Sequence, residues 1–135
     1  MKCLLAITIL FSGMALAQPP RGYYPWWDRP VAKDLNLSTA QTAQIRTTVR
    51  EYRDKLIGLR AALQKAELDF QDHFDDENID QKKAEQSIEN LSHARENLTR
   101  AFSEMSLRLR LVLTSQQWKE LQKRREAEAP AASKK

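Results

Sequence analysis

The sequence predicts an all-α protein built on a long antiparallel helical hairpin with short flanking helices. From Val31 to Ala129 the chain contains no proline and a single glycine, Gly58, so few residues in this stretch oppose helix formation. Two runs of apolar residues alternate steps of four and three, which is the spacing of a heptad seam. A short acidic segment separates the two runs, as expected where two helices turn back on each other.

The first 17 residues have the pattern of a secretory signal peptide. Lys2 is followed by an apolar run over 3–16, and Ala15-Leu16-Ala17 supplies a small-x-small cleavage site. We therefore expect residues 1–17 to be removed in export to the periplasm, with no membrane span after cleavage. An uncleaved N-terminal anchor is the alternative.

The composition of the mature chain excludes several classes of function. Its 118 residues suffice for one small domain, and its 21 basic and 18 acidic side chains leave a net charge of +3, too small to indicate a nucleic-acid partner. The only cysteine, Cys3, lies in the signal, which excludes disulfides and Cys-based metal sites. No nucleophile–base set or glycine-rich phosphate loop is present, so we expect neither an enzyme nor a cofactor.

A leader rich in proline and aromatic residues follows over 18–36. Its prolines oppose a long helix. Four aromatic side chains in this leader are costly to leave in water: Tyr23, Tyr24, Trp26 and Trp27. We expect Trp26 and Trp27 to pack near the base of the hairpin, the alternative being an exposed arm that contacts other proteins.

The helical domain is expected over 37–128. A first long helix is predicted from Ser38 to Phe74, followed by a polar turn over 72–80. The apolar or small residues of its seam are Ile45, Val49, Tyr52, Leu56, Leu59, Leu63, Ala66 and Phe70. The seam of the second long helix is Ala84, Ile88, Leu91, Arg95, Leu98, Phe102, Met105, Leu109 and Val112, interrupted only by Arg95. A third helix should begin at Thr114, and residues 129–135 should form a disordered tail.

Several apolar residues fall outside both seams and indicate a second packing surface. They are Ile57, Leu68, Leu107 and Leu111. A homodimer closes such a surface most simply, because two identical hairpins bury the same patch reciprocally. The alternative is that the last helix and the aromatic leader fold back over these residues within one chain.

Two near-copies of one short motif flank the hairpin. They are Leu37-Ser38-Thr39-Ala40-Gln41 and Leu113-Thr114-Ser115-Gln116-Gln117. In each, the Ser or Thr can cap a new helix, and the Gln three residues later can reach back to the capping residue. The functional elements of the motif are thus Leu37, Ser38 and Gln41 in one copy and Leu113, Thr114 and Gln117 in the other. They predict helix starts, at opposite ends of the hairpin sequence but at the same end in space.

The paired motifs resemble the LTxxQ repeat of the Spy/CpxP family of periplasmic stress chaperones, over roughly residues 30–125. The second copy matches fully, whereas Ser38 replaces threonine in the first. The resemblance implies an intertwined homodimeric cradle and an ATP-independent holdase that binds partly unfolded envelope proteins. Relatives of the family include periplasmic heavy-metal sensors and resistance proteins, and a CpxP-like regulator would bind the periplasmic domain of an envelope stress sensor kinase.

An arginine stripe is the first candidate binding surface. Arg46, Arg53 and Arg60 are spaced by seven residues and so share a helical face, with Arg50 beside them. The simpler interpretation is a solvated flank whose arginine stems cover the seam. The resemblance implies instead a basic, partly apolar face for clients, to which the second long helix would add further candidates: Arg100, Arg108 and Arg110.

Metal binding is the remaining candidate. The tip carries seven carboxylates over 67–80 and could attract a divalent cation weakly. It lacks the spacing and the glycine of an EF-hand, and the favoured interpretation is a solubilising turn between two helices. The two histidines, His73 and His93, lie 20 residues apart. His93 has Glu89 and Glu96 on neighbouring turns, a partial ligand set that departs from the multi-histidine pattern of the sensors.

Overall fold

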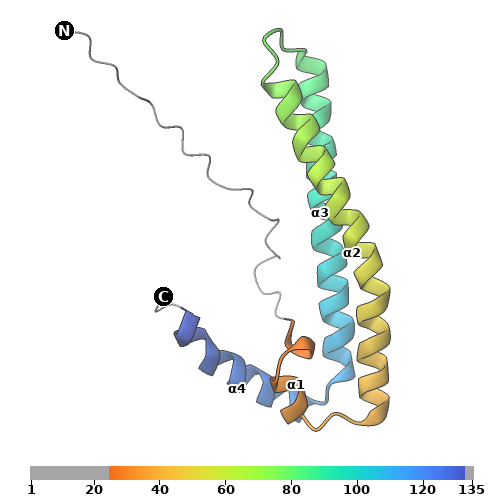
Figure 1. The fold of residues 1–135 in the computed structure, drawn as a ribbon, viewed down its shortest axis with the longest axis vertical. Coiled ribbons are helices and arrows are strands. Elements are labelled where there is room, and N and C mark those ends of the chain that lie inside the picture. The colour runs from red at the N-terminus through yellow and green to blue at the C-terminus, as the bar shows by residue number, and fades with distance from the viewer. Residues whose placement is uncertain (1–24, 133–135) are drawn as a thin grey trace, which may run out of the picture.

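The computed structural model describes residues 25–132, and side chains as far as Glu128. The described part is all-helical and contains no strand (Figure 1). A 3₁₀ turn, η1, spans Trp26–Asp28, and the short helix α1 spans Val31–Asp34. The two long helices are α2, Thr39–Phe74, and α3, Gln81–Val112, and the last helix is α4, Ser115–Ala132. The all-α fold class and the long hairpin with short flanking helices are confirmed.

The hairpin is held by the predicted seam of α2. Ile45, Tyr52, Leu56, Leu63 and Ala66 are buried, and the other seam residues are partly buried against them. With 36 residues, α2 is about 54 Å long at 1.5 Å per residue. Each long helix has one facing partner along most of this length (Figure 1), so a single apolar stripe per helix carries the packing.

The seam of α3 differs from the predicted one near the tip. Ser87 is 3% exposed, whereas Ile88 is 48% exposed, and Ala94 packs against the core in the place predicted for Arg95. The residues that face α2 are therefore the buried positions 84, 87, 91 and 98 and the partly buried position 94. Positions 87 and 94 replace the predicted positions 88 and 95, whereas 84, 91 and 98 are as predicted. Ser87 tolerates burial because its hydroxyl donates to the Ala84 carbonyl at 2.7 Å. The prediction chose Ile88 for the buried position because isoleucine is the more hydrophobic residue. It did not consider that the Ser87 hydroxyl can be buried when it donates to a backbone carbonyl of its own helix.

The aromatic leader packs at the base of the hairpin, as expected for its two tryptophans. Trp26 is 5% exposed and lies edge-on to Trp27, with ring centroids 5.9 Å apart. Tyr23 and Tyr24 lie outside the described residues. After α1, Asn36 adopts a φ of 49°, a left-handed conformation that asparagine tolerates and that redirects the chain into α2.

Helix α4 begins beside α1 and leaves the base at an angle to the hairpin (Figure 1). Arg124 bridges the two segments, since it contacts Asp34 and Glu120 at 2.7 Å each. Its hydrogen bond to Glu120, with the nearby Asp34 charge, raises the pKa of Arg124 above its ordinary value. The helix continues to Ala132, into the segment expected to be a disordered tail, since alanine and glutamate favour helix up to Pro130.

Both motifs form complete capping boxes. In the first, the Gln41 backbone N–H donates to Ser38 Oγ at 3.1 Å and the Ser38 N–H donates to Gln41 Oε1 at 2.9 Å. In the second, the Gln117 N–H donates to Thr114 Oγ1 at 3.2 Å and the Thr114 N–H donates to Gln117 Oε1 at 2.9 Å. Leu113 is buried and Leu37 is partly buried, so each motif also anchors the chain before its helix.

The two boxes are joined through their glutamines. Gln41 Nε2 donates to Gln117 Oε1 at 2.8 Å, and Gln117 Nε2 donates to Gln41 Oε1 at 3.1 Å. Each amide also donates its second hydrogen to a backbone carbonyl. Gln41 Nε2 donates to the Val112 carbonyl at 2.8 Å, and Gln117 Nε2 donates to the Leu35 carbonyl at 3.1 Å. Each amide thus uses both donors and both acceptor positions of a glutamine side chain. This cross-linked pair, Gln41 and Gln117, is called the glutamine clasp below.

The corrected seam makes a testable distinction. Replacing Leu98, which is 7% exposed, with alanine should lower the free energy of unfolding by about 2–5 kcal/mol through lost burial and a cavity. Ile88→Ala is the matched control and should change it by less than about 1 kcal/mol, because that side chain is half exposed. Urea denaturation followed by circular dichroism measures both, and equal losses would contradict the register.

The glutamine clasp predicts that replacing Gln117 by glutamate, which has nearly the same shape, lowers the stability of the protein. Gln117→Glu keeps the acceptor for the cap but removes both donors, and places a carboxylate beside Gln41 Oε1 and the Leu35 carbonyl. We expect a loss of about 1–3 kcal/mol in unfolding free energy. Gln116→Glu, an exposed neighbour, should stay within about 0.5 kcal/mol of the parent. Comparable stability of the two variants would show that only the capping box is used.

Candidate protein-binding surface

The hairpin has two flanks of different character, and its register defines them. On one flank, the Arg60 guanidinium lies over the Phe102 ring at 5.3 Å, and Arg95 pairs with Glu67 at 3.5 Å. These two contacts are seven residues apart on both helices. Each contact joins one residue of α2 to one residue of α3, and the two contacts lie on the same side of the hairpin. This side is called the rung flank below, and the series of cross-helix positions along it is called the ladder.

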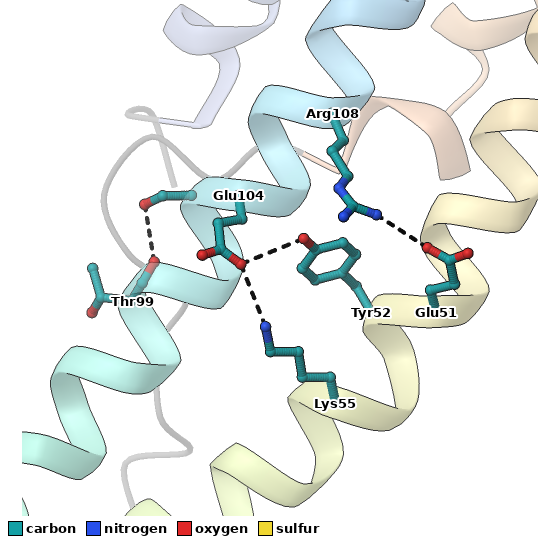
Figure 2. Close-up of polar contacts among 7 residues, drawn as sticks. Glu51, Tyr52, Lys55, Thr99, Glu104 and Arg108 are labelled. Atoms are coloured by element: carbon teal, nitrogen blue, oxygen red, sulfur yellow. Dashed lines mark hydrogen bonds and ion pairs between the residues drawn. The ribbon is translucent and has the colours of Figure 1, made fainter.

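The opposite flank is closed by its own ion pairs. Glu51 forms an ion pair with Arg108 at 3.2 Å, and Glu104 forms one with Lys55 at 3.4 Å. Figure 2 shows both contacts. The Tyr52 hydroxyl donates to the same Glu104 carboxylate at 3.5 Å, and the Arg108 guanidinium lies 5.3 Å from the Tyr52 ring centroid. Each charge shown at this level of the hairpin has an opposite charge facing it, so this side is called the paired flank.

The predicted arginine stripe lies on the side of α2 that belongs to the rung flank. Arg46, Arg50, Arg53, Ile57 and Arg60 follow one another in steps of four and three, so they form one continuous row. All five are exposed, Ile57 by 58%. Within the described part of the chain, the first three arginines have no ion pair, whereas Arg60 is stacked on Phe102. This row is called the basic stripe.

The three arginines proposed on α3 do not join the basic stripe. Arg108 belongs to the paired flank, and Arg100 pairs with Glu96 on its own helix. Arg110 stacks over Trp118 at 4.5 Å and donates to the Leu113 carbonyl at 3.3 Å, so it supports the start of α4. Sequence spacing placed basic residues on each helix, and the folded chain pairs them in two ways: Arg108 with Glu51 of the facing helix, and Arg100 with Glu96 of its own helix.

The metal-ligand candidates stay dispersed. His93 is exposed on α3, and Glu96 is engaged by Arg100, whereas His73 is half-buried in the last turn of α2. Over residues 25–128, no three His, Cys, Asp or Glu side chains gather into a group that could hold a metal ion. The possible metal set of His93, Glu89, Glu96 and His73 remains a prediction from spacing.

The off-seam apolar residues are exposed, as their position outside the seams predicts. Ile57, Leu68, Leu107 and Leu111 are 58%, 55%, 59% and 73% exposed, so neither α4 nor the described part of the leader, residues 25–36, covers them. The structure adds three residues that sequence reasoning did not single out, all near the tip: Phe74, Ile79 and Ile88. Correct assignment of the seam at Ser87 would have identified Ile88.

These features define a class of protein: a helical hairpin that presents exposed apolar and basic side chains along one flank. The chain belongs to the heavy-metal resistance family, whose model matches residues 3–120. Searches of curated proteins and of solved structures found no match. None of the described helices combines the length and the hydropathy needed to cross a bilayer. Within this family, the closer resemblance to Spy/CpxP proteins stays a prediction.

Proposed function

We propose that this protein is a periplasmic holdase of the heavy-metal resistance family, which binds partly unfolded envelope proteins along the basic stripe. The observation that carries the proposal is the contrast between the flanks. On the paired flank, Lys55 and Arg108 face carboxylates, whereas Arg46, Arg50 and Arg53 form no ion pair with any described residue and lie beside an exposed Ile57.

The chemistry of the basic stripe suits loose binding of many clients. Unpaired arginines attract acidic segments over about 10 Å at moderate salt and so raise the rate of encounter. Arginine stems and Ile57 then offer apolar contact without a shaped pocket, and guanidinium groups also stack on aromatic rings, as Arg60 does on Phe102. Such a surface holds a client without demanding one client structure. Nothing in this chemistry requires a nucleotide.

An aggregation assay tests the proposal. The wild-type protein should suppress light scattering by an acidic client that aggregates on reduction, at near-stoichiometric ratio and without nucleotide. The triple variant Arg46→Gln/Arg50→Gln/Arg53→Gln should need about tenfold more protein for the same suppression, because three charged contacts of about 0.2–1 kcal/mol each are lost.

The matched control removes equal charge elsewhere. Lys55→Gln/Arg100→Gln/Arg108→Gln takes three cations from sites that are already paired, and should suppress aggregation nearly as well as the wild type. Equal loss in both triple variants would mean that only net charge matters. Absence of suppression by the wild type across several clients would remove the holdase function altogether.

Metal sensing is the second candidate, and family membership favours it. His93 is exposed, with Glu89 one turn before it and Glu96 one turn after it on the same helix. Two carboxylates and one imidazole are a partial set for Zn²⁺, which commonly takes four ligands. A second subunit or a client would have to complete the site.

Calorimetry with Zn²⁺, Ni²⁺ and Cu²⁺ decides this candidate. A sensor should bind at micromolar or tighter affinity, and His93→Ala should abolish the heat while His73→Ala leaves it unchanged. No measurable heat with any of the three metals would eliminate metal sensing. A CpxP-like regulatory role would instead be supported by capture of a sensor kinase's periplasmic domain on the immobilised protein.

A further inference from the structure

The hairpin tip carries an apolar patch distinct from the basic stripe. Phe74, Ile79 and Ile88 are 62%, 54% and 48% exposed. Phe74 and Ile88 are the next positions of the ladder after Glu67–Arg95, seven residues further along α2 and seven residues earlier on α3. The register therefore places these two side chains opposite each other on the rung flank. Ile79 lies in the turn that joins the helices. These three residues are called the tip patch.

The tip patch is partly preorganised. The Phe74 ring packs on Phe70 with centroids 5.6 Å apart and planes inclined by 33°, and Phe70 itself packs against the core of the hairpin. Ile88 stands within α3, whose first turn is capped by Asp80 accepting from the Lys83 N–H at 3.1 Å. A partner would therefore meet side chains on ordered helix ends, which reduces the entropy lost on binding.

Negative charge that no ion pair of the described chain neutralises lies at the same tip. Asp72, Asp75, Asp76 and Glu77 are exposed, and no cation of the described chain forms an ion pair with any of them. The two flanking ion pairs along the chain are each local to one helix: Lys65 with Asp69 at 2.7 Å on α2, and Lys83 with Asp80 at 3.7 Å at the start of α3. Large apolar side chains that share the tip with carboxylates outside any ion pair are complementary to an apolar segment bordered by cations.

We propose that the tip patch is a docking site for a cationic amphipathic segment of another protein, with apolar residues at helical spacing between lysines or arginines. The apolar side chains supply contact, and the four carboxylates orient the segment and select against acidic partners. An anionic lipid surface would be repelled by the same charge. The site goes beyond the proposed holdase function, because the basic stripe carries the opposite charge and suits the opposite class of partner.

The test uses a fluorescently labelled Leu/Lys amphipathic peptide and the mature chain, with anisotropy as the readout. The peptide should bind the wild type, more weakly at higher salt, and its Leu/Glu counterpart should not bind at the tip. Phe74→Gln/Ile88→Gln should weaken binding about tenfold, and so should Asp75→Asn/Asp76→Asn/Glu77→Gln. Leu107→Gln/Leu111→Gln removes exposed apolar side chains from elsewhere on α3 and is the matched control.

Several outcomes would overturn the proposal. Unchanged affinity in both tip variants, or equal loss in the Leu107/Leu111 variant, would place the peptide elsewhere. A dimer in sedimentation that becomes monomeric in the tip variants would show that a second copy of the chain occupies the patch. Helicity by circular dichroism verifies folding of each variant. The holdase assay with an acidic client is an independent readout, since tip variants should leave it unchanged even if peptide binding is lost.

Discussion

The architecture depends on the glutamine clasp, in which the side-chain amides of Gln41 at the start of α2 and Gln117 at the start of α4 form hydrogen bonds with each other. A capping box alone would satisfy an orphan N–H of each helix start. By pairing the two boxes, Gln41 and Gln117 also bind the carbonyls of Val112 and Leu35, which end α3 and α1. Four helix termini are thereby held at one point. This clasp orients α4 and the leader relative to the hairpin.

The hairpin above the clasp is a thin structure with one buried stripe on each long helix. Among the described residues, α2 and α3 pack only on each other along most of their length (Figure 1), so their remaining faces are exposed in the single chain. The chain covers part of that surface with ion pairs on the paired flank, as Figure 2 shows for Glu51, Lys55, Glu104 and Arg108. The rung flank is less neutralised, which leaves a basic stretch on α2 and an acidic, apolar tip. The hairpin therefore carries opposite charges at different levels, basic on the middle of α2 and acidic at the tip.

Much of the fold follows from local rules. The starts of α2 and α4 were predicted from Ser38 and Thr114, and the buried seam of α2 from its heptad spacing. The error at Ser87 and Ile88 has a definite physical origin. A heptad pattern assigns burial by hydropathy, but a serine whose hydroxyl is satisfied by its own helix can occupy a narrow site between two helices. Because Ser87 occupies the buried position near the tip, the neighbouring Ile88 is exposed to solvent.

The sequence by itself determined where α2 and α4 begin, which α2 residues line the buried seam, and that four apolar side chains lie outside the seams. These properties depend on residues close together in the chain, through capping, helical periodicity and the absence of proline. Only the tertiary structure decided which arginines are neutralised, because ion pairs such as Glu51–Arg108 join residues 57 apart in sequence. The same holds for the glutamine clasp: the motifs predicted two separate caps, and their contact required α3 to return the chain to its starting point.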